Sequence, residues 1–307
     1  MKNTGSTCRS AVVALAGRPN SGKSTLLNTL IGEQLSVVTS LPQTTRSILR
    51  GIYQEPNLQL VFVDTPGIHR GNRRLNQSML SACTKALTRD NADIVCYVVD
   101  LAREYGEEEE LACRLIAESG IPALVVFNKS DLCPQTREKI DEFQKRFPTT
   151  SSLPHIALSA IDTRARKGFI NAIGPLVPPG PPIFPEDELT DAPLRYLAAE
   201  YLRKHIILNT RREVPHATHV EILSYRETPR KHTVEAAIHV ETTGQRGIIV
   251  GKGGSLIRTV GTRAARDLSS LAGVPVRYKC HVKVTPKWRD NPGFLRSMGY
   301  QSARGGK

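Results

Sequence analysis

Short runs of consecutive apolar residues alternate with longer amphipathic stretches along the first 176 residues of the chain. Runs such as 11–16 and 58–63 have the length of buried strands, whereas 75–87 and 107–117 have the length of helices. Strands that alternate with helices predict an α/β fold, with a mixed, mostly parallel sheet and helices on both faces. The predicted strands are 11–16, 47–53, 58–63, 94–99, 121–127 and 155–158, and the predicted helices are 25–31, 75–87 and 107–117.

The pattern changes after residue 193. An apolar stripe over 194–208 predicts a helix, and the segments 219–223 and 234–240 alternate apolar with polar residues, as half-buried strands do. A helix over 256–271 and a strand over 276–284 follow. This order of elements predicts a second domain of the α+β class.

A proline-rich segment separates the two patterns. Residues 175–193 contain seven prolines, which exclude a helix or a central strand and favour a stiff spacer. The predicted organisation is a first domain over 9–176, a linker over 177–193, a second domain over 194–290 and a basic C-terminal tail over 291–307.

The net charge of +13 is unevenly distributed. Residues 1–191 contain 21 Lys and Arg and 21 Asp and Glu, whereas residues 192–307 contain 21 basic and 8 acidic residues. The entire surplus therefore lies in the second half, which favours a polyanionic partner there. A basic surface that is merely solvated is the alternative.

The cysteines and the hydropathy of the chain indicate the cellular compartment of the protein. The six cysteines contain no C-x-x-C pair, which favours free thiols in a reducing cytosol over disulfides or a zinc site. No apolar run reaches the roughly 20 residues that a spanning helix needs. The polar N-terminus lacks the apolar core of a signal peptide, so we expect a cytoplasmic protein.

The segment 17–25 matches the pattern G-x-x-x-x-G-K-S, which is typical of a loop that cradles the phosphates of a nucleoside triphosphate. Its glycines let consecutive backbone N–H groups point at phosphate oxygens. Lys23 adds charge for the outer phosphates, Ser24 offers a hydroxyl to Mg²⁺, and the next helix directs its positive end at the anion. The residues predicted to line this loop are Gly17, Arg18, Pro19, Asn20, Ser21, Gly22, Lys23, Ser24 and Thr25.

A D-x-x-G motif follows the strand predicted over 58–63. The carboxyl end of this strand should lie beside the phosphate loop. Asp64 can then hold the Mg²⁺ shell, and the Gly67 N–H can approach a terminal phosphate. The predicted site residues of this motif are Asp64, Thr65, Pro66 and Gly67.

An N-K-x-D motif follows the strand predicted over 121–127 and selects the base. The Asp131 carboxylate can accept hydrogen bonds from N1 and N2 of guanine, a pair of donors that adenine lacks. Asn128 is predicted to buttress the site and the Lys129 stem to pack over the ring. A backbone N–H at Ser159–Ala160 is predicted to meet the guanine O6.

These motifs, in this order, resemble the GTPase superfamily. The resemblance implies that GTP and GDP are the ligands, that Mg²⁺ is the cofactor, and that GTP is hydrolysed to GDP and phosphate. Catalytic roles are thereby assigned to Lys23, Thr45 and Gly67. The sequence alone leaves Thr44 and Thr45 open as the switch threonine, and the T-T-R form of the motif favours Thr45. The predicted magnesium ligands are Ser24, Thr45 and Asp64.

Ile68 stands where Ras-like proteins have the glutamine that positions the attacking water. This departure resembles the translation-factor-related GTPases, several of which use K⁺ in place of an arginine finger. In those proteins an asparagine of the phosphate loop ligates K⁺, which assigns this role to Asn20, together with backbone of residues 36–43. The alternative for Asn20 is a turn residue chosen for its backbone conformation.

In the second half, an I-V-G-x-x-G sequence lies between two helical segments. With its neighbouring elements it resembles a KH domain of the type II topology, whose loop clamps the backbone of about four nucleotides. Lys252 is then a phosphate contact. The predicted RNA-binding residues are Ile249, Gly251, Lys252, Gly253, Gly254 and Arg258.

The two halves together resemble the Era family of bacterial GTPases, over residues 11–300. Segments 43–46, 189–191 and 295–300 carry the resemblance outside the nucleotide motifs. It implies a monomer that binds the 3′ end of 16S rRNA during assembly of the 30S subunit and associates loosely with the inner membrane. The basic residues from Lys283 onward serve either RNA or anionic lipid, and we favour RNA.

Two other functions are open to test, and a third is excluded. An RNA-binding protein whose G domain senses GTP and GDP without significant turnover is the first, although Lys23, Ser24 and Asp64 are intact. A GTP-dependent kinase is the second, although no acceptor-binding His/Asp constellation is evident. A related GTPase with two G domains is excluded, because the sequence contains one glycine loop of this kind.

Overall fold

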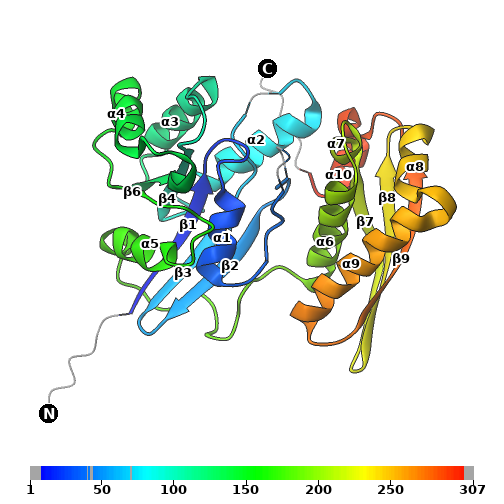
Figure 1. Cartoon of the computed structure of the whole chain (residues 1–307). Helices are drawn as coiled ribbons and strands as arrows, with labels where there is room; N and C mark the ends of the chain where they lie inside the picture. The colour runs from blue at the N-terminus through cyan, green and yellow to red at the C-terminus, as the bar shows by residue number, and fades with distance from the viewer. Residues whose placement is uncertain (1–7, 40, 42–43, 70, 301–307) are drawn as a thin grey trace, which may run out of the picture. The chain divides into compact units, whose positions relative to one another are not determined.

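The computed structural model describes residues 8–39, 41, 44–69 and 71–300, and the chain forms two compact units. The first unit comprises residues 1–36, 42–72 and 76–191. The second comprises residues 37–41, 73–75 and 192–307. Figure 1 shows the first unit in blue to green and most of the second in yellow-green to red.

The first unit is built around a six-stranded sheet in the order β2-β3-β1-β4-β5-β6. All neighbouring strands are parallel except β2, which is antiparallel to β3. The predicted mixed, mostly parallel sheet is therefore confirmed. The strands are β1 (Arg9–Ala16), β2 (Leu49–Glu55), β3 (Leu58–Asp64), β4 (Ile94–Asp100), β5 (Ala123–Asn128) and β6 (His155–Ala157).

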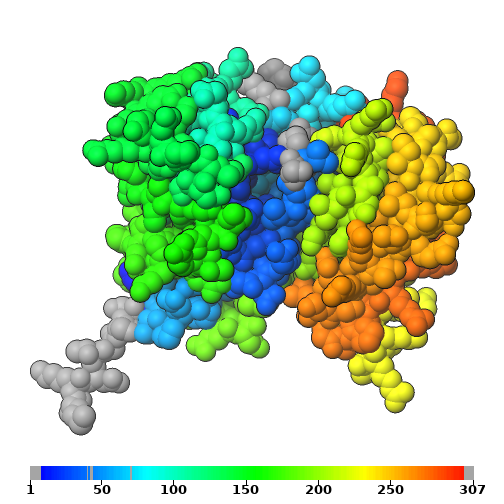
Figure 2. Space-filling model, in the orientation of Figure 1, coloured from blue at the N-terminus to red at the C-terminus, as the bar shows by residue number. Residues whose placement is uncertain are grey.

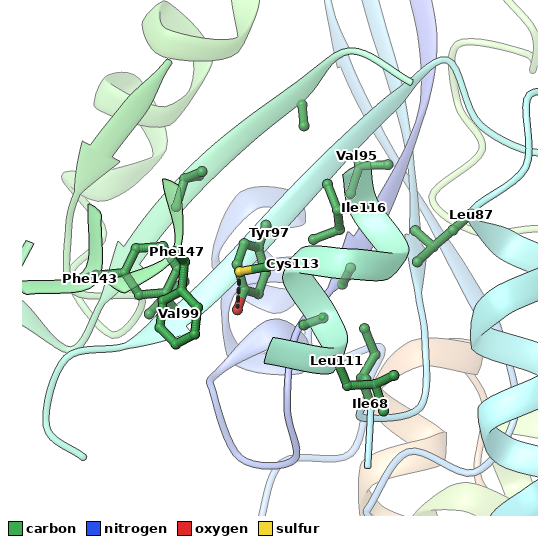
Figure 3. Packing of buried hydrophobic residues seen from close by; sticks show 14 of the residues in the cluster. Ile68, Leu87, Val95, Tyr97, Val99, Leu111, Cys113, Ile116, Phe143 and Phe147 are labelled. Carbon is green, nitrogen blue, oxygen red and sulfur yellow. Dashed lines mark hydrogen bonds between the residues drawn. The ribbon is translucent and has the colours of Figure 1, made fainter. Parts of the chain in front are cut away.

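Helices cover both faces of this sheet (Figure 1). Phe62 of β3 packs on Phe169 of α5, with ring centroids 5.7 Å apart. On the opposite face, alternate residues of β1, β4 and β5 form a hydrophobic core with α2, α3 and α4 (Figure 3). The helices are α1 (Lys23–Ile31), α2 (Arg74–Ala86), α3 (Glu107–Ser119), α4 (Thr136–Arg146) and α5 (Ala165–Ile173), with 3-10 turns at Ser130–Leu132, Pro148–Thr150 and Gly174–Leu176.

The proline-rich segment packs against the first unit. The Gly180 N–H donates to the Cys8 carbonyl at 3.0 Å, and the Gln59 side chain bonds the backbone of Ile183 and Phe184. The Ile52 N–H donates to the Leu189 carbonyl at 2.9 Å. The segment predicted to be a spacer is thus held along β2 by a backbone hydrogen bond and along β3 by the Gln59 side chain.

The second unit has a three-stranded sheet in the order β7-β8-β9, in which β7 and β8 are antiparallel and β8 and β9 are parallel. Helices α6 and α9 lie on one face of the sheet (Figure 1), where the Tyr278 hydroxyl donates to the Ala198 carbonyl. The predicted α+β fold is confirmed. The elements are α6 (Leu194–Asn209), α7 (Val214–Ala217), β7 (His219–Thr228), β8 (Lys231–Val240), α8 (Thr243–Val250), a 3-10 turn (Lys252–Gly254), α9 (Ser255–Ala272), β9 (Val276–Val284), a 3-10 turn (Trp288–Asp290) and α10 (Pro292–Ser297).

The segment after β9 differs from the expected tail. Trp288 is fully buried and its indole N–H donates to the Ala217 carbonyl at 2.7 Å, while Leu295 and Tyr300 are also buried. Residues 291–300 therefore fold onto the second unit, because their apolar side chains have a surface to cover. Residues 301–307, the end of the predicted tail, lie outside the described residues.

Candidate nucleotide and RNA sites

The phosphate loop joins β1 to α1 and takes a backbone path that depends on glycine. Gly17 has φ 146° and Gly22 has φ 100°, in the region that residues with a Cβ rarely adopt. A Cβ on Gly22 would lie 2.0 Å from Nδ2 of Asn128, and one on Gly67 would lie 2.6 Å from the Pro19 nitrogen. The loop is therefore in close contact, through the backbone of Pro19, with the D-x-x-G turn on one side and with the Asn128 side chain of the N-K-x-D motif on the other.

Lys23 is folded over this loop. Its Nζ donates to the Gly17 carbonyl at 3.0 Å and to the Arg18 carbonyl at 2.9 Å. Burial lowers the pKa of Lys23, and the nearby Asp64 carboxylate raises it in part. A phosphate at this position would replace the two carbonyls with a stronger, charged partner.

Three hydroxyls converge on the Asp64 carboxylate. Oδ2 accepts from Ser36 at 2.6 Å, from Ser24 at 2.7 Å and from Thr45 at 3.4 Å, and the Ser24 and Thr45 hydroxyls are 2.9 Å apart. Burial raises the pKa of Asp64, although these hydrogen bonds and Lys23 lower it in part. The buried Oδ1 has no hydrogen-bond partner in the described part of the chain. The predicted ligands Ser24, Thr45 and Asp64 thus lie together.

Ser36 was not among the predicted magnesium ligands. It lies beyond the end of α1, where its backbone N–H and carbonyl are both held by the Asn28 side chain at 2.8 Å. The only signal in the sequence was its place at the start of the loop that leads to the switch threonine. Its hydroxyl is as close to Asp64 as that of Ser24.

Two residues of the D-x-x-G segment face the interior. The Thr65 hydroxyl donates to the Leu15 carbonyl at 2.7 Å and is fully buried, so it joins β1 to β3 and does not face a nucleotide. Ile68 is also fully buried and packs near Leu111 of α3 (Figure 3). The position after Gly67 is therefore part of the hydrophobic core, and its side chain is not available to orient an attacking water.

Arg18 points away from the phosphates. Its guanidinium forms a buried ion pair with Glu109 at 2.9 Å and donates to the Glu104 carbonyl at 3.0 Å. Burial raises the pKa of Glu109, and the Arg18 charge lowers it in part. The prediction that Arg18 lines the nucleotide site therefore applies to its backbone, whose carbonyl contacts Lys23, and not to its side chain.

The Asn128 amide joins the motifs of the base site. Its Nδ2 donates to the Ser21 carbonyl, and its Oδ1 accepts from the Ala160 N–H, both at 2.8 Å. The Ala160 N–H predicted to meet the guanine O6 is thus already bonded to Asn128. This pairing links the phosphate loop, β5 and the segment after β6.

Lys129 and Asp131 flank the base position. Lys129 has φ 65°, and its Nζ pairs with the fully buried Asp100 at 2.7 Å. No motif singled out Asp100, which ends β4 directly beside Asn128. Asp131 is exposed, and its carboxylate has no hydrogen bond or ion pair within the described ranges, so it is open to an incoming base.

Asn20 has φ 62°, a left-handed conformation that asparagine tolerates better than most residues. This geometry agrees with the turn role, and both alternatives for Asn20 remain. The predicted potassium site also includes residues 40, 42 and 43, which lie outside the described ranges. Among the described residues, no group of three His, Cys, Asp or Glu side chains is arranged to hold a metal ion.

The G-x-x-G turn of the second unit also depends on glycine. Gly251, Gly253 and Gly254 have φ of 70°, 58° and 76°, and no described atom lies within 4 Å of a Cβ built on Gly253. Lys252 is exposed, and Arg258 donates to the Gly253 carbonyl at 2.8 Å. The turn presents open backbone and two cations.

The prediction for Ile249 needs correction. Its side chain is 1% exposed and packs inside the unit, whereas Ile248 is 49% exposed. The reason is that α8 continues to Val250, so that the helical period turns Ile249 to the core. The exposed apolar side chain beside the turn is that of Ile248.

A groove of about 570 Å³ lies between α9 and β9, beside the G-x-x-G turn. It is lined by apolar and small residues as well as cations. Of these residues, Gly254 and Arg258 were predicted from the sequence. The others are Ile257, Gly261, Thr262, Ala265, Val276, Arg277, Tyr278 and Cys280.

Family models of known proteins match both halves of the chain. A family model described as a 50S ribosome-binding GTPase matches residues 12–129, and a KH domain model matches residues 213–289. We call the second unit the KH unit from here on. GTPase Era of Synechocystis is 36% identical over 294 residues, 95% of this chain and 93% of that protein. GTPase Era of Lactobacillus delbrueckii subsp. bulgaricus is 38% identical over 295 residues, 95% and 96% of the two chains.

Solved structures of Era have the same fold over nearly the whole chain. Era in complex with MgGDPNP and nucleotides 1506–1542 of 16S ribosomal RNA has a TM-score of 0.89 and 34% identity, over 95% of this chain and 99% of that one. A variant of Aquifex aeolicus Era bound to GDP and AlF₄⁻ has the same values. No helix of the described residues is long and apolar enough to cross a membrane. The chain therefore belongs to the Era family of GTPases and hydrolyses GTP.

Proposed function

We propose that this GTPase binds the 3′ region of 16S rRNA through its KH unit and acts as a nucleotide-dependent switch in assembly of the 30S subunit. The observation that carries the proposal is the presence, on one chain, of the Asp64 hydroxyl cluster and the open G-x-x-G turn beside its groove. The Era structure with MgGDPNP and 16S nucleotides 1506–1542 supports the choice of RNA. The basic surplus of residues 192–307 supports it as well.

Mg²⁺ fits the cluster at Asp64. Hard oxygen ligands suit this ion, and the buried, unpartnered Oδ1 of Asp64 offers a further oxygen beside the three hydroxyls. We assign Ser24 and Thr45 as ligands and Asp64 to the shell, with Ser36 as a support for the carboxylate. When bound, Mg²⁺ neutralises charge on the phosphate oxygens.

The residues of the chain then have distinct roles in hydrolysis. Lys23 leaves the Gly17 and Arg18 carbonyls and contacts the outer phosphates, while the Gly67 N–H faces the terminal phosphate. Thr45, which lies beside Ser24 and Asp64, would be held there by the ion and the γ-phosphate, and its release after hydrolysis would free the switch segment. Asp131 reads the guanine N1 and N2 donors, and the Lys129 stem, held by Asp100, covers the ring.

A potassium ion held by Asn20 is a further part of the proposal. It would supply the positive charge that an arginine finger supplies in other GTPases, because the transition state gathers charge on phosphate oxygens. GTP hydrolysis measured in buffers that differ only in K⁺ and Na⁺ tests it. Equal rates would remove the ion and leave Asn20 with the turn role.

The RNA proposal is tested by crosslinking the protein to rRNA with GTP or GDP bound and mapping the crosslinked nucleotides. We expect sites near the 3′ end of 16S rRNA, with a yield that depends on the nucleotide. The variants Gly253→Asp and Gly254→Asp should lose these crosslinks while binding GDP as the wild type does. Unchanged crosslinks in both variants would contradict the assignment of the clamp.

Hydrolysis of GTP by a member of this family argues against the alternative of a sensor without significant turnover. Phosphate release from GTP in the presence of Mg²⁺ measures the rate of the switch. Action as a monomer and a peripheral contact of the basic C-terminal residues with the inner membrane stay predictions. Gel filtration and sedimentation with anionic vesicles test them.

A further inference from the structure

The segment between β4 and α3 joins two of the nucleotide motifs. Its Glu104 carbonyl accepts from the Arg18 guanidinium of the phosphate loop at 3.0 Å. Its Leu101 N–H donates to the Asn128 carbonyl of the N-K-x-D motif, also at 3.0 Å. We call residues 101–106 the connecting segment, because they contact both motifs.

A buried carboxylate lies at each end of the connecting segment. Asp100 ends β4 and is fully buried, and Glu109, in the first turn of α3, is 2% exposed. Oδ1 of Asp100 accepts from the Ala102 N–H at 3.0 Å. Oε2 of Glu109 accepts from the Gly106 N–H at 2.9 Å, as an acidic side chain at this helical position commonly does. Each carboxylate therefore holds the backbone of the segment with one oxygen.

The second oxygen of each carboxylate holds a cation of a nucleotide motif. Oδ2 of Asp100 pairs with Nζ of Lys129 at 2.7 Å, and Oε1 of Glu109 pairs with Nη1 of Arg18 at 2.9 Å. All four carboxylate oxygens are thus occupied by protein donors, so these residues act on a nucleotide through their partners. Removing one member of a buried pair leaves the other charge uncompensated, and each cation is therefore fixed by its carboxylate.

The two cations serve opposite ends of a nucleotide. The Arg18 carbonyl accepts from Nζ of Lys23 at 2.9 Å and from the Ser21 N–H at 3.3 Å. The anchored guanidinium therefore fixes the backbone of the loop that cradles the phosphates. Lys129 has φ 65° and is 29% exposed, and its pairing with Asp100 fixes the direction of the stem assigned to the base.

The middle of the connecting segment is open to solvent. Ala102, Arg103 and Glu104 are exposed, whereas Tyr105 is buried and packs edge-on against Phe143 with ring centroids 5.2 Å apart. Figure 2 shows turquoise atoms of this part of the chain at the surface, next to the dark-blue atoms of the phosphate loop. Exposed segments with few buried contacts open locally at low cost, so the order of this segment depends on the links at its ends.

We propose that Asp100 and Glu109 are positioning residues for the binding of guanine nucleotides, an inference that rests on the nucleotide site of the proposed function. Glu109 acts on the phosphate loop through Arg18. Asp100 acts on the base site through Lys129. Groups that are ordered before binding lower its entropic cost, so the loss of either carboxylate weakens the retention of GDP.

The test uses Asp100→Asn and Glu109→Gln in the full-length protein. Each substitution keeps the shape of the side chain and an oxygen for the backbone N–H, and removes the charge that faces the cation. The matched control is Glu110→Gln, whose carboxylate is 61% exposed and lies 3.8 Å from Arg146 at the surface. Affinities for GDP and GMP are measured by displacement of a fluorescent GDP, and thermal unfolding reports the fold.

The ratio of the two affinities distinguishes positioning from a general loss of structure. We expect Glu109→Gln to lower the affinity for GDP about tenfold, and that for GMP by less, because GMP lacks the β-phosphate. Asp100→Asn should lower both affinities by the same factor, since the base is common to both ligands. The Glu110→Gln control should match the wild type.

A double variant tests whether the buried charge of Arg18 is the cause. Arg18→Gln combined with Glu109→Gln replaces the ion pair with two amides, which can bond each other. We expect it to bind GDP more tightly than Glu109→Gln alone, because no buried charge is then left without a partner. This comparison also applies if the single variant is unstable.

Several results would overturn the proposal. Wild-type affinity for GDP in both Asp100→Asn and Glu109→Gln would remove the positioning role. Equal losses of GDP and GMP in Glu109→Gln, without recovery in the double variant, would show that this carboxylate only stabilises the domain. A matching loss in Glu110→Gln would assign the effect to general charge. A wild-type protein that does not prefer GDP to ADP would instead refute the base site of the proposed function.

Discussion

Replacing Asn128 with alanine tests the claim that one buried amide holds the nucleotide motifs together. The side chain is 1% exposed, and it satisfies the Ser21 carbonyl and the Ala160 N–H, each at 2.8 Å. Truncation leaves both backbone groups without their partner. A buried polar group that loses its partner costs about 1–3 kcal/mol, so the two together cost about 2–6 kcal/mol. Water that enters the vacated space brings the cost toward the lower value.

The assay is amide hydrogen exchange, read by mass spectrometry over the peptides that contain Ser21 and Ala160. A local method is preferable because a chain of two units need not unfold in one step. A loss of about 2 kcal/mol accelerates exchange from the opened state about 30-fold. GDP affinity should fall in the same variant.

Asp131→Ala is the matched control, because Asp131 is exposed and its proposed role is to bind the base. This variant should exchange like the wild type while losing GDP affinity. Exchange of Asn128→Ala at the wild-type rate would contradict this prediction, since the two hydrogen bonds would then contribute nothing to the order of the site.

Further predictions concern the switch and the RNA turn. Gly67→Ala places a Cβ 2.6 Å from the Pro19 nitrogen, and the displacement should lower kcat for GTP hydrolysis about 100-fold, measured by phosphate release. Ile68→Gln should not raise that rate, because the position is buried; it should lower stability by about 2 kcal/mol or more in thermal unfolding. Ile248→Asn should weaken RNA binding without lowering the melting temperature, and Ile249→Asn should lower it; the reverse outcome would contradict their assigned faces.

Most of the fold could be predicted because its signals are local. Apolar runs of strand length located the six strands of the first unit to within a few residues, and the alternating segments located β7 and β8. Helices α4 and α5 were not predicted, because few of their residues are buried. The helix α10 was assigned to a tail, since nothing in a short basic segment reveals that Leu295 has a surface to cover.

The order of the motifs along the chain establishes which of them meet. The phosphate loop follows β1, Asp64 ends β3 and Asn128 ends β5, and the carboxyl ends of these parallel strands share one edge of the sheet, so the proximity of the motifs follows from the order of the chain. How each polar group is used depends on the three-dimensional fold. Arg18 pairs with Glu109, Lys129 pairs with Asp100, and the Ala160 N–H is held by Asn128. Such partners lie 29 or more residues apart, and a hydrogen bond is fixed by ångström distances that no local pattern contains.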